Sequence, residues 1–318
     1  MIIVRTPFRV SLFGGGTDYP TWYEQNGGAV LSTTIDKYCY ISMRKLPPFF
    51  EHKHRIVYSQ TEDAHTTEEI RHPKVRECLK SLNVQEGLEI HHDGDLPARS
   101  GLGTSSSFTV GLLQALYTLY KIPYDKVKLA LDAIHIERDV VGENVGNQDQ
   151  VAVAVGGLNL IDFYSTGKFA LTPLEASGLD KWLLLAFTGF ARTASTIAGT
   201  YDLKSEGLTA MQNMVPVALE ALEAREFEKF GHLLGSSWNL KKGLSPEISN
   251  PYIDYMYDKA QNAGALGGKI LGAGGGGFLL LFAEPCKHEA IKAALKGLLF
   301  VPFKFEKEGS QVIFNSEV

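Results

Sequence analysis

The chain has 318 residues, of which 44% are hydrophobic and 21% are charged, as in ordinary folded globular proteins. Its net charge of -5 at pH 7 provides no basic field for a phosphate backbone, so we expect no nucleic-acid partner. No apolar run reaches the ~18 residues that span a bilayer, and the opening segment MIIVRTPFRV lacks the apolar core of a secretory signal, so we expect no membrane partner.

The first third of the chain is predicted to form a β-sheet. Its segments are rich in β-branched and aromatic residues and are separated by glycine or proline, which is the pattern of short strands. The predicted strands cover residues 2–14, 29–35, 37–46 and 55–60, and a further strand and turn cover 87–97.

A glycine-rich turn follows the first predicted strand. The segment FGGGTDYP places Gly15, Gly16, Thr17 and Asp18 just past the strand end. A carboxylate only accepts hydrogen bonds, which suits neighbouring sugar hydroxyl donors, so Asp18 is a candidate sugar ligand. A glycine turn capped by the aspartate side chain is the alternative interpretation.

A second glycine-rich segment, SGLGTSSSF, leads into a predicted helix whose apolar spacing begins at Phe108. Gly101 and Gly103 allow backbone angles that other residues avoid, and the hydroxyl residues 104–107 open the helix. Backbone N–H groups and the helix dipole favour an anion there, and the hydroxyls can hold phosphate oxygens or Mg²⁺, so we expect a triphosphate. The segment is not the common P-loop, because no GKS or GKT follows. By itself it is equally compatible with a well-capped helix start.

The next predicted helix and the loop after it each carry one acidic residue of interest. The helix is predicted from about Tyr124 to Val141 and carries Glu137, and the following segment GENVGNQDQ carries Asp149. We expect the two carboxylates to converge on one site. Phosphoryl transfer needs one acidic group to orient or deprotonate the attacking hydroxyl and another to hold a metal. A solvated helix carboxylate and a turn or capping aspartate are the alternative.

The second half of the chain changes in element type. Strands are predicted at 157–163 and 181–187, and from about Gly207 the sequence becomes helical, with a further helix at 251–263. The chain is predicted to end with strands at 269–273 and 277–284, a helix at 288–298, and strands at 301–307 and 310–315. The change near residue 180 predicts two domains, 1–180 and 181–318.

Five glycines, Gly272 and Gly274 to Gly277, stand between the apolar strands of KILGAGGGGFLLLF. Each glycine inside an element costs roughly 0.5–1 kcal/mol relative to alanine, so the run indicates close approach of the backbone to a ligand or to another loop. Gly274 and Gly275 are therefore candidate ligand contacts. A flexible hairpin turn is the alternative, although two glycines would be enough for it.

The three cysteines, Cys39, Cys78 and Cys286, are widely spaced and odd in number, so they cannot form a complete disulfide framework. We expect each to be a small buried apolar side chain in a reducing, cytoplasmic environment.

The segments FGGGTDYP, LPARSGLGTSSSF, GNQDQ and KILGAGGGGF, in this order, resemble the GHMP kinase superfamily over nearly the whole chain. LPARSGLGTSSSF is similar to the family's phosphate loop, usually PxxxGLGSSAA, with Thr104 for the first serine and Ser106 and Ser107 for alanines. KILGAGGGGF is similar to the family's third motif. The resemblance implies an α+β fold with an S5-like N-terminal, ATP-binding domain and a ferredoxin-like C-terminal domain.

Within the superfamily, GGAVLSTTIDKY and LKKGLSPEISNP are most similar to the heptose 7-phosphate kinase branch, and L-fucose kinase domains are similar too. The resemblance implies phosphorylation of the anomeric hydroxyl of D-glycero-D-manno-heptose 7-phosphate by ATP and Mg²⁺, for nucleotide-activated heptose and surface polysaccharide. The alternatives are an L-fucose or galactose kinase, a kinase of mevalonate-type or homoserine substrates, and a non-catalytic sugar or nucleotide sensor. Monomer and homodimer both stay open.

The resemblance also implies roles for individual residues. By motif, Asp149 is the catalytic carboxylate, and Ser105 and Glu137 hold Mg²⁺. The triphosphate cradle comprises Gly101, Leu102, Gly103, Thr104, Ser105 and Ser106. Where galactokinase-like members have a GEHTDY-type segment, GGGTDY keeps Asp18 but lacks the Glu and His, and the implied sugar contacts are Asp18, Gly15, Gly16, Thr17, Gly274 and Gly275. An acceptor that already carries a phosphate needs cations away from the glycine loop, and the candidates are Arg9, Arg99, Arg192, Lys241 and Lys242.

Overall fold

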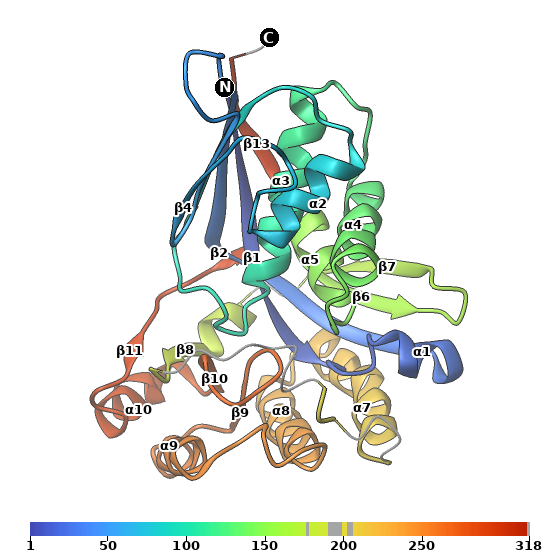
Figure 1. Cartoon of the computed structure of the whole chain (residues 1–318). Coiled ribbons are helices and arrows are strands. Elements are labelled where there is room, and N and C mark those ends of the chain that lie inside the picture. Colours follow the sequence, from blue (N-terminus) through green and yellow to red (C-terminus); the bar gives the residue numbers. More distant parts are fainter. Residues whose placement is uncertain (176–177, 190–198, 202–205, 317–318) are drawn as a thin grey trace.

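The computed structural model describes residues 1–175, 178–189, 199–201 and 206–316. Two β-sheets lie one above the other in Figure 1, each with its own helices. No helix in these ranges is both long and apolar enough to cross a membrane. Of the cysteines, Cys39 and Cys78 are buried as expected, whereas Cys286 is exposed.

The larger sheet is built on one long antiparallel pair, β1 (Ile2–Phe13) and β2 (Gly28–Lys45). The sequence predicted two strands in place of β2, divided at Asp36. The structure has one strand, because a bulge opposite Pro7 and Phe8 absorbs the polar residues 36 and 37 without ending the pairing. From Thr6 onward every residue of β1 is buried, since the strand contacts helices of both halves of the chain.

The strand order of this sheet is β13-β1-β2-β5-β3-β4, with β6 and β12 also paired to β2 and β7 paired to β6. The other strands are β3 (His54–Val57), β4 (Thr61–Ala64), β5 (Leu88–Gly94), β6 (Leu158–Phe163), β7 (Phe169–Leu174), β12 (Phe305–Glu306) and β13 (Gln311–Asn315).

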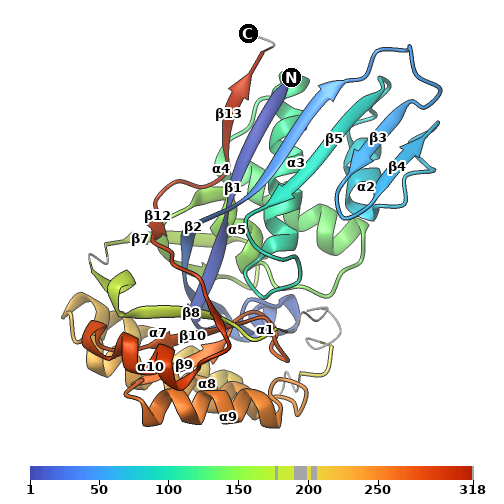
Figure 2. The same ribbon diagram turned by 90° about the vertical axis from the view of Figure 1, so that its left-hand side faces the viewer.

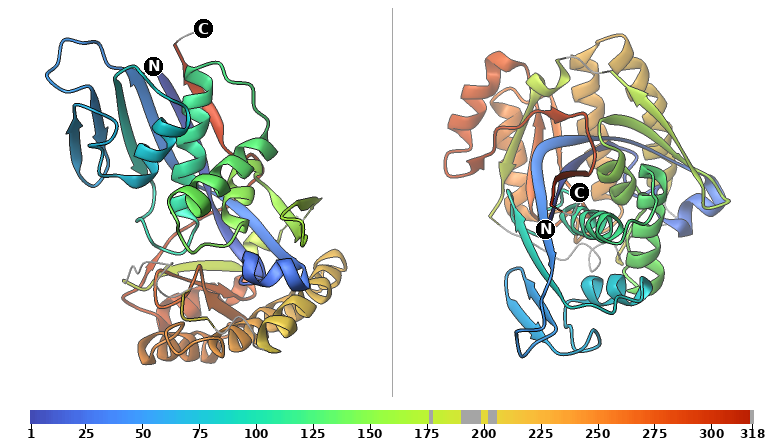
Figure 3. Two further views of the ribbon diagram at one scale, coloured as in Figure 1. Left: turned by 45° about the vertical axis from the view of Figure 1, so that its right-hand side comes forward. Right: turned by 90° about the horizontal axis from the view of Figure 1, so that it is seen from above.

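Helices lie along one side of the larger sheet (Figures 1 and 3). They are α2 (Pro73–Ser81), α3 (Thr104–Leu119), α4 (Lys126–Ile134), the π-helix η1 (His135–Val140) and α5 (Gln148–Val155), while α1 (Pro20–Asn26) follows the first glycine turn. The apolar helix α3 lies directly against β1: a Cβ added at Gly111 would lie 2.8 Å from Thr6 Oγ1. The helix predicted from about 124 to 141 is confirmed as α4 plus η1. The segment predicted as a loop through Gln150 instead begins α5 at Gln148, which places Asp149 in a helical first turn.

The smaller sheet has the order β11-β8-β10-β9, and helices lie beneath it in Figure 2. Its elements are β8 (Leu183–Phe187), β9 (Gly267–Ile270), β10 (Phe278–Phe282) and β11 (Leu299–Phe300), with α7 (Glu206–Glu223), α8 (Phe227–Lys242), α9 (Pro251–Asn262), α10 (His288–Ala294) and the short turns η2 (Leu179–Trp182) and η3 (Pro285–Lys287). The strand pair predicted around the glycine run is confirmed as β9 and β10, which pair antiparallel.

The end of the chain returns to the larger sheet, where β13 pairs with β1, so both termini lie close together (Figure 2). Aromatic packing joins the two halves, with the rings of Phe13 and Phe230 edge to face at 5.1 Å. The division at residue 180 stays a prediction, and it does not include this return of β12 and β13.

Candidate active site

A groove of about 840 Å³ lies at the N-terminus of α3, where the β1–α1 turn, α2, the loop before α5 and α8 also reach it. The predicted site residues that line it are Arg9, Gly15, Gly16, Asp18, Arg99, Gly101, Gly103, Thr104, Ser105, Ser106, Asp149 and Lys241. Thr17, Leu102, Glu137, Gly274 and Gly275 are not among the lining residues. Residues far apart in sequence are thus gathered at one helix start.

The predicted phosphate loop, residues 101–106, lies against the glycine run that comprises Gly272 and Gly274 to Gly277. Gly101 and Gly103 have φ angles of 86° and 70°, and Gly103 is the N-cap residue of α3. A Cβ at Gly101 would lie 2.4 Å from the carbonyl oxygen of Leu271, and one at Gly272 would lie 2.6 Å from Gly101 Cα. The two loops therefore support each other by backbone contact that side chains would prevent.

The part of this glycine run that begins at Gly274 packs away from the groove. Gly275 N donates to the carbonyl of Ile248 (2.8 Å), and a Cβ at Gly274 would lie 2.8 Å from the same oxygen. Of the two interpretations of this run, contact with another loop is confirmed. Gly274 and Gly275 therefore pack against Ile248, and their contact with a ligand stays a prediction.

Arg9 and Asp149 form a bidentate ion pair in the groove. Arg9 Nε and Nη2 donate to Asp149 Oδ1 and Oδ2, each at 2.7 Å, and Arg9 Nη1 donates to the Gly101 carbonyl at 2.7 Å. The Arg9 side chain is almost fully buried, whereas a quarter of the Asp149 side chain is exposed. Bidentate pairing fixes the direction of a carboxylate as well as its charge, so Asp149 is held facing the groove beside the glycine loop.

Asp18 joins the first glycine turn to the start of α5. Its Oδ1 accepts from Gly16 N (2.9 Å) and its Oδ2 from Gln148 N (3.2 Å). Burial raises the pKa of Asp18 above its ordinary value, and the charge of Asp149 adds to this effect. Thr17 is fully buried and donates from Oγ1 to the Gly14 carbonyl (2.8 Å), so it shapes the turn and does not face the groove.

Glu137 lies behind the N-terminus of α3, fully buried in the π-helix η1. It accepts hydrogen bonds from Ser106 Oγ (2.9 Å), from Thr109 Oγ1 and from Gln150 Nε2, and Lys74 Nζ lies 2.6 Å from its Oε1. Burial alone would raise the pKa of Glu137, but Lys74 and these donors hold it below its ordinary value. A solvated carboxylate is therefore excluded for Glu137. π-Helical turns of this kind are frequent at functional sites.

Two further buried lysines reach the groove near Asp18. Lys241 Nζ donates to the Gly272 carbonyl, and Lys269 Nζ donates to the Leu12 carbonyl at 3.1 Å. Burial and the neighbouring Arg9 charge lower the pKa of Lys241 to about 8. Burial and the charges of Lys241 and Arg9 lower the pKa of Lys269 well below its ordinary value.

An aromatic cluster lines another part of the groove. The centroid of the His72 ring lies 5.0 Å from that of Tyr58 and 4.7 Å from that of Phe108. The centroid of the His92 ring lies 5.0 Å from that of Phe108. Burial and the charge of Lys74 lower the pKa of His72 to about 4, and burial also lowers the pKa of His92. Both histidines are therefore neutral rings at pH 7, suited to contact with a flat apolar group.

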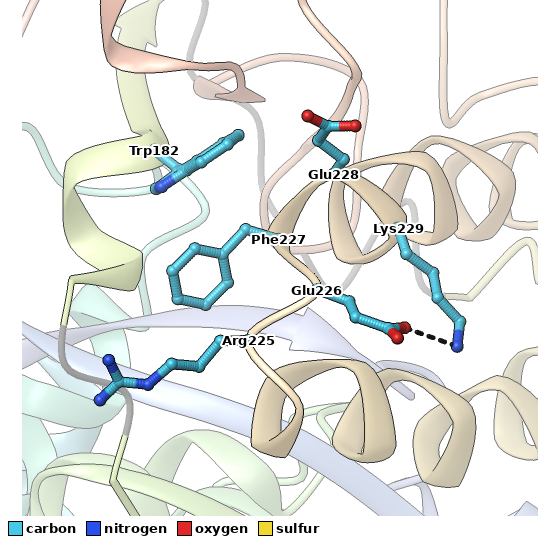
Figure 4. Close-up of a pocket in the computed structure, with 6 residues that line it drawn as sticks. All are labelled: Trp182, Arg225, Glu226, Phe227, Glu228 and Lys229. Atoms are coloured by element: carbon cyan, nitrogen blue, oxygen red, sulfur yellow. Dashed lines mark hydrogen bonds and ion pairs between the residues drawn. The ribbon is translucent and has the colours of Figure 1, made fainter.

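A second hollow, shown in Figure 4, lies where α7 meets α8 and is lined by Trp182, Arg225, Glu226, Phe227, Glu228 and Lys229. Its ion pair, Glu226 to Lys229 at 2.9 Å, is half exposed and is worth about 0–1 kcal/mol. It contains none of the predicted site residues, so the groove is the candidate active site.

The sequence did not identify Lys74 or Lys269. It predicted an acceptor phosphate as the partner of Arg9, whereas the structure pairs Arg9 with Asp149. Arg9 stands between Phe8 and Val10, and Lys269 is followed by Ile270 and Leu271; a charge beside such apolar residues is a signal that could have identified these positions. Lys74 carries no such signal, since a lysine near a helix start is ordinary surface chemistry until the fold buries it. Of the other cations, Lys242 pairs with Asp254 at 3.3 Å, and Arg192 lies outside the described residues.

Comparison with known proteins identifies two matching family models and several relatives. The model of the GHMP kinases N terminal domain matches residues 72–157, and that of the GHMP kinases C terminal domain matches residues 218–298. The chain is 32% identical to a D-glycero-alpha-D-manno-heptose 7-phosphate kinase of Campylobacter jejuni over 97% of each chain. It is 28% identical to a galactokinase of Pyrococcus furiosus over 92% of each.

Solved structures show the same fold. A D-glycero-D-manno-heptose 1-phosphate kinase from Bacteroides thetaiotaomicron superposes with a TM-score of 0.80 at 24% identity, covering 99% of both chains. The Lactococcus lactis galactokinase complexed with galactose superposes with a TM-score of 0.75 at 21% identity, covering 98% of this chain and 94% of the other.

Proposed function

The chain belongs to the GHMP kinase family and is an ATP-dependent sugar kinase, and we propose that its acceptor is D-glycero-D-manno-heptose 7-phosphate, phosphorylated at the anomeric hydroxyl. The C. jejuni relative of that activity, similar over 97% of each chain, supports this choice. The product, a heptose 1,7-bisphosphate, would feed a nucleotide-activation step.

The observation that carries the proposal is the position of Asp149. Its carboxylate faces the groove beside Gly103, where an added Cβ would lie 3.5 Å from Asp149 Oδ2, and Arg9 ties it to the Gly101 carbonyl. A hydroxyl bound against Asp149 is therefore next to phosphates bound at the glycine loop. That adjacency is what in-line phosphoryl transfer needs.

The triphosphate would lie on the backbone N–H groups of residues 101–106, at the positive end of the α3 dipole. Ser105 and Glu137 fit as Mg²⁺ ligands, because their oxygens already converge on one cation, the Lys74 ammonium, and hydroxyl and carboxylate oxygens are the ligands that Mg²⁺ prefers. Mg²⁺ would offset the phosphate charge. Tyr58, His72, His92 and Phe108 would receive the adenine ring.

The transfer step follows from this arrangement. The anomeric oxygen forms a bond to the γ-phosphorus as the bond from that phosphorus to the bridging oxygen of ADP breaks. Asp149 orients the hydroxyl and accepts its proton. Arg9 holds the carboxylate in place throughout. No covalent intermediate with the protein forms.

Polar groups without partners support a sugar at this end of the groove. Ser11 Oγ and Gln148 Oε1 are buried and have no hydrogen-bond partner among the described residues, and both side chains lie close to Gly15. A buried polar atom that lacks a partner is rare and costly in a native protein. We therefore place sugar hydroxyls against Ser11, Gln148 and Asp18, with Gly15 and Gly16 as the backbone surface.

The charge of this region supports an acceptor that already carries a phosphate. Among its described residues, three buried cations, Arg9, Lys241 and Lys269, face two carboxylates, Asp18 and Asp149. Burial, and after it the neighbouring cations, lowers the pKa of both lysines, so the free protein disfavours their charged forms. A phosphate dianion would favour those charged forms, whereas a neutral sugar would not.

An ADP-release screen tests the acceptor. The panel is heptose 7-phosphate, unphosphorylated heptose, L-fucose, galactose, mannose, mevalonate and homoserine. Release with heptose 7-phosphate far above the others is expected. Release only with a neutral sugar would replace the proposed acceptor, and release with none would favour a non-catalytic sensor.

A further inference from the structure

Lys74, the second residue of α2, places its ammonium where three oxygens meet. Lys74 Nζ lies 2.6 Å from Ser105 Oγ, 2.6 Å from Glu137 Oε1 and 3.0 Å from Glu143 Oε2, and its side chain is 5% exposed. None of the sequence motifs includes it. Its position on the helix is unfavourable, since a cation in the first turn opposes the helix dipole and no acidic residue shares that turn. The three oxygens, not the helix, therefore account for its placement.

We propose that Lys74 is the internal counter-ion of the metal site: its ammonium occupies the cation position in the nucleotide-free enzyme and leaves it when Mg²⁺ arrives with ATP. Because Ser105 and Glu137 are metal ligands only under the proposed function, this role rests on that function. Lys74 is thus a positioning residue, which acts through Ser105 and Glu137.

Burial explains why such a counter-ion is needed. Glu137 is fully buried, and a buried carboxylate without a cation is strongly unfavourable. Ser106, Thr109 and Gln150 satisfy its oxygens by hydrogen bonds but carry no charge. Lys74 supplies the positive charge and keeps Ser105 and Glu137 aimed at one point before any nucleotide binds.

Glu143 explains how the ammonium can leave. Unlike Glu137, its side chain is 28% exposed and lines the groove, so it can follow Lys74 as the ammonium moves. Two cations cannot occupy one position, because their repulsion at contact distance exceeds any gain from sharing the same oxygens. Lys74 would therefore move with Glu143 toward the groove, where its charge stays close to the phosphates.

The test uses the full chain without nucleotide or sugar, with Mn²⁺ as the probe. Thermal unfolding is recorded with and without MnCl₂ for the wild type, for Lys74→Met, and for Lys80→Met, a control on the same helix whose lysine is 41% exposed. We expect Mn²⁺ to leave the Tm of the wild type and of Lys80→Met unchanged. Lys74→Met should unfold at a lower temperature and regain several degrees on Mn²⁺ addition, because the metal then binds the vacated oxygens.

Electron paramagnetic resonance of free Mn²⁺ measures the same competition directly. If the ammonium vacates the position about one tenth of the time, its removal tightens the apparent metal affinity about tenfold. A Lys74→Met protein with neither a Mn²⁺-dependent Tm nor tighter Mn²⁺ binding would overturn the proposal and leave Lys74 as an ordinary buried ion pair.

Lys74→Gln covers the case in which Lys74→Met fails to fold, because its amide can donate to Ser105 and Glu137 without a charge. Should both variants fold only when Mn²⁺ is present, that outcome supports the counter-ion role, and failure to fold in either condition counts against it. These measurements use no sugar. A negative result in the heptose assay would therefore contradict the proposed acceptor and leave the counter-ion role of Lys74 unaffected.

Discussion

Arg9 binds both carboxylate oxygens of Asp149 at 2.7 Å and, with its remaining nitrogen, the carbonyl of Gly101. One guanidinium thereby links the proposed catalytic carboxylate to the proposed phosphate loop. Asp149 and Gly101 lie on separate segments, and Arg9 comes from β1, which contacts both halves of the chain. The spacing between Asp149 and the glycine loop therefore depends on a residue of the larger sheet and not on either loop alone.

Asp149→Asn should lower kcat about 10²- to 10⁴-fold, because the amide cannot accept the proton of the attacking hydroxyl. ATP binding, measured by calorimetry, should be unchanged, since the glycine loop is intact. Asp63→Asn, a half-exposed carboxylate on β4, is the matched control and should keep full turnover. Full activity in Asp149→Asn would exclude it as the catalytic carboxylate.

Ser105→Ala should raise the Mg²⁺ concentration needed for half-maximal activity by at least about tenfold, the loss seen even when supporting groups of metal sites are removed. The measurement is a Mg²⁺ titration at saturating ATP and sugar. Ser81→Ala, on the exposed side of the fold in α2, should leave the titration unchanged. An identical Mg²⁺ requirement in Ser105→Ala would remove Ser105 from the metal site.

Glu137→Gln should destabilise the protein by about 3–5 kcal/mol at pH 7, because Lys74 is left as a buried charge with a weaker partner. The pKa of Glu137 is held below its ordinary value, so its contribution is complete above the unfolded pKa of about 4.3 and is lost as the pH falls through the folded value. Urea unfolding of the wild type and variant between pH 7 and pH 3 should therefore show a gap that closes on acidification. A gap that is constant with pH would contradict the charged state of Glu137; the exposed Glu24→Gln serves as control.

Because the pKa of Lys241 is lowered, we expect sugar binding to depend on pH. Its pKa of about 8 lies below that of an ordinary lysine, so it loses its charge as the pH rises above about 8 and attracts the acceptor phosphate less. The kcat/KM for heptose 7-phosphate should fall over this range in the wild type. Lys241→Met should have a lower kcat/KM from the start and lack this decline, while Lys242→Met should resemble the wild type. Matching pH profiles in the wild type and Lys241→Met would exclude the role.

Comparison of Gly101→Ala with Gly167→Ala distinguishes the cost of backbone strain from the cost of disturbing the contact between the two loops. Both Gly101 and Gly167 have a positive φ, but an added Cβ meets the Leu271 carbonyl at 2.4 Å in the first case and nothing within 4 Å in the second. Gly167→Ala should therefore cost only the strain of about 1 kcal/mol. Gly101→Ala should lower the Tm further and also weaken ATP binding. Equal effects of the two substitutions would show that the loops do not support each other in this way.

Much of the architecture could be predicted from sequence because its signals are local. The β9–β10 pair follows from two apolar runs around a turn, the helix start at Thr104 follows from the glycine turn and hydroxyl residues, and the start at Pro251 follows from the proline itself. The continuation of β2 past Asp36 could not be predicted, because it depends on a bulge against β1. Tertiary pairing decided that case over local composition.

The site was predictable where a residue type is unusual in its context. Asp18, Ser105 and Asp149 all line the groove, as the motifs implied. The roles of Gly274 and Lys74 could not be derived, since a glycine that packs on Ile248 and a lysine that is buried by three oxygens look like any others in sequence. Their roles depend on which segments the fold brings together.

The most direct test of the central claim is phosphorus and proton NMR of the product formed from ATP and heptose 7-phosphate. We predict one new phosphate resonance, coupled to the anomeric proton, with the original 7-phosphate signal retained. Absence of a new sugar phosphate, or a new phosphate on any other hydroxyl, would contradict the assignment of this chain as a heptose 7-phosphate 1-kinase.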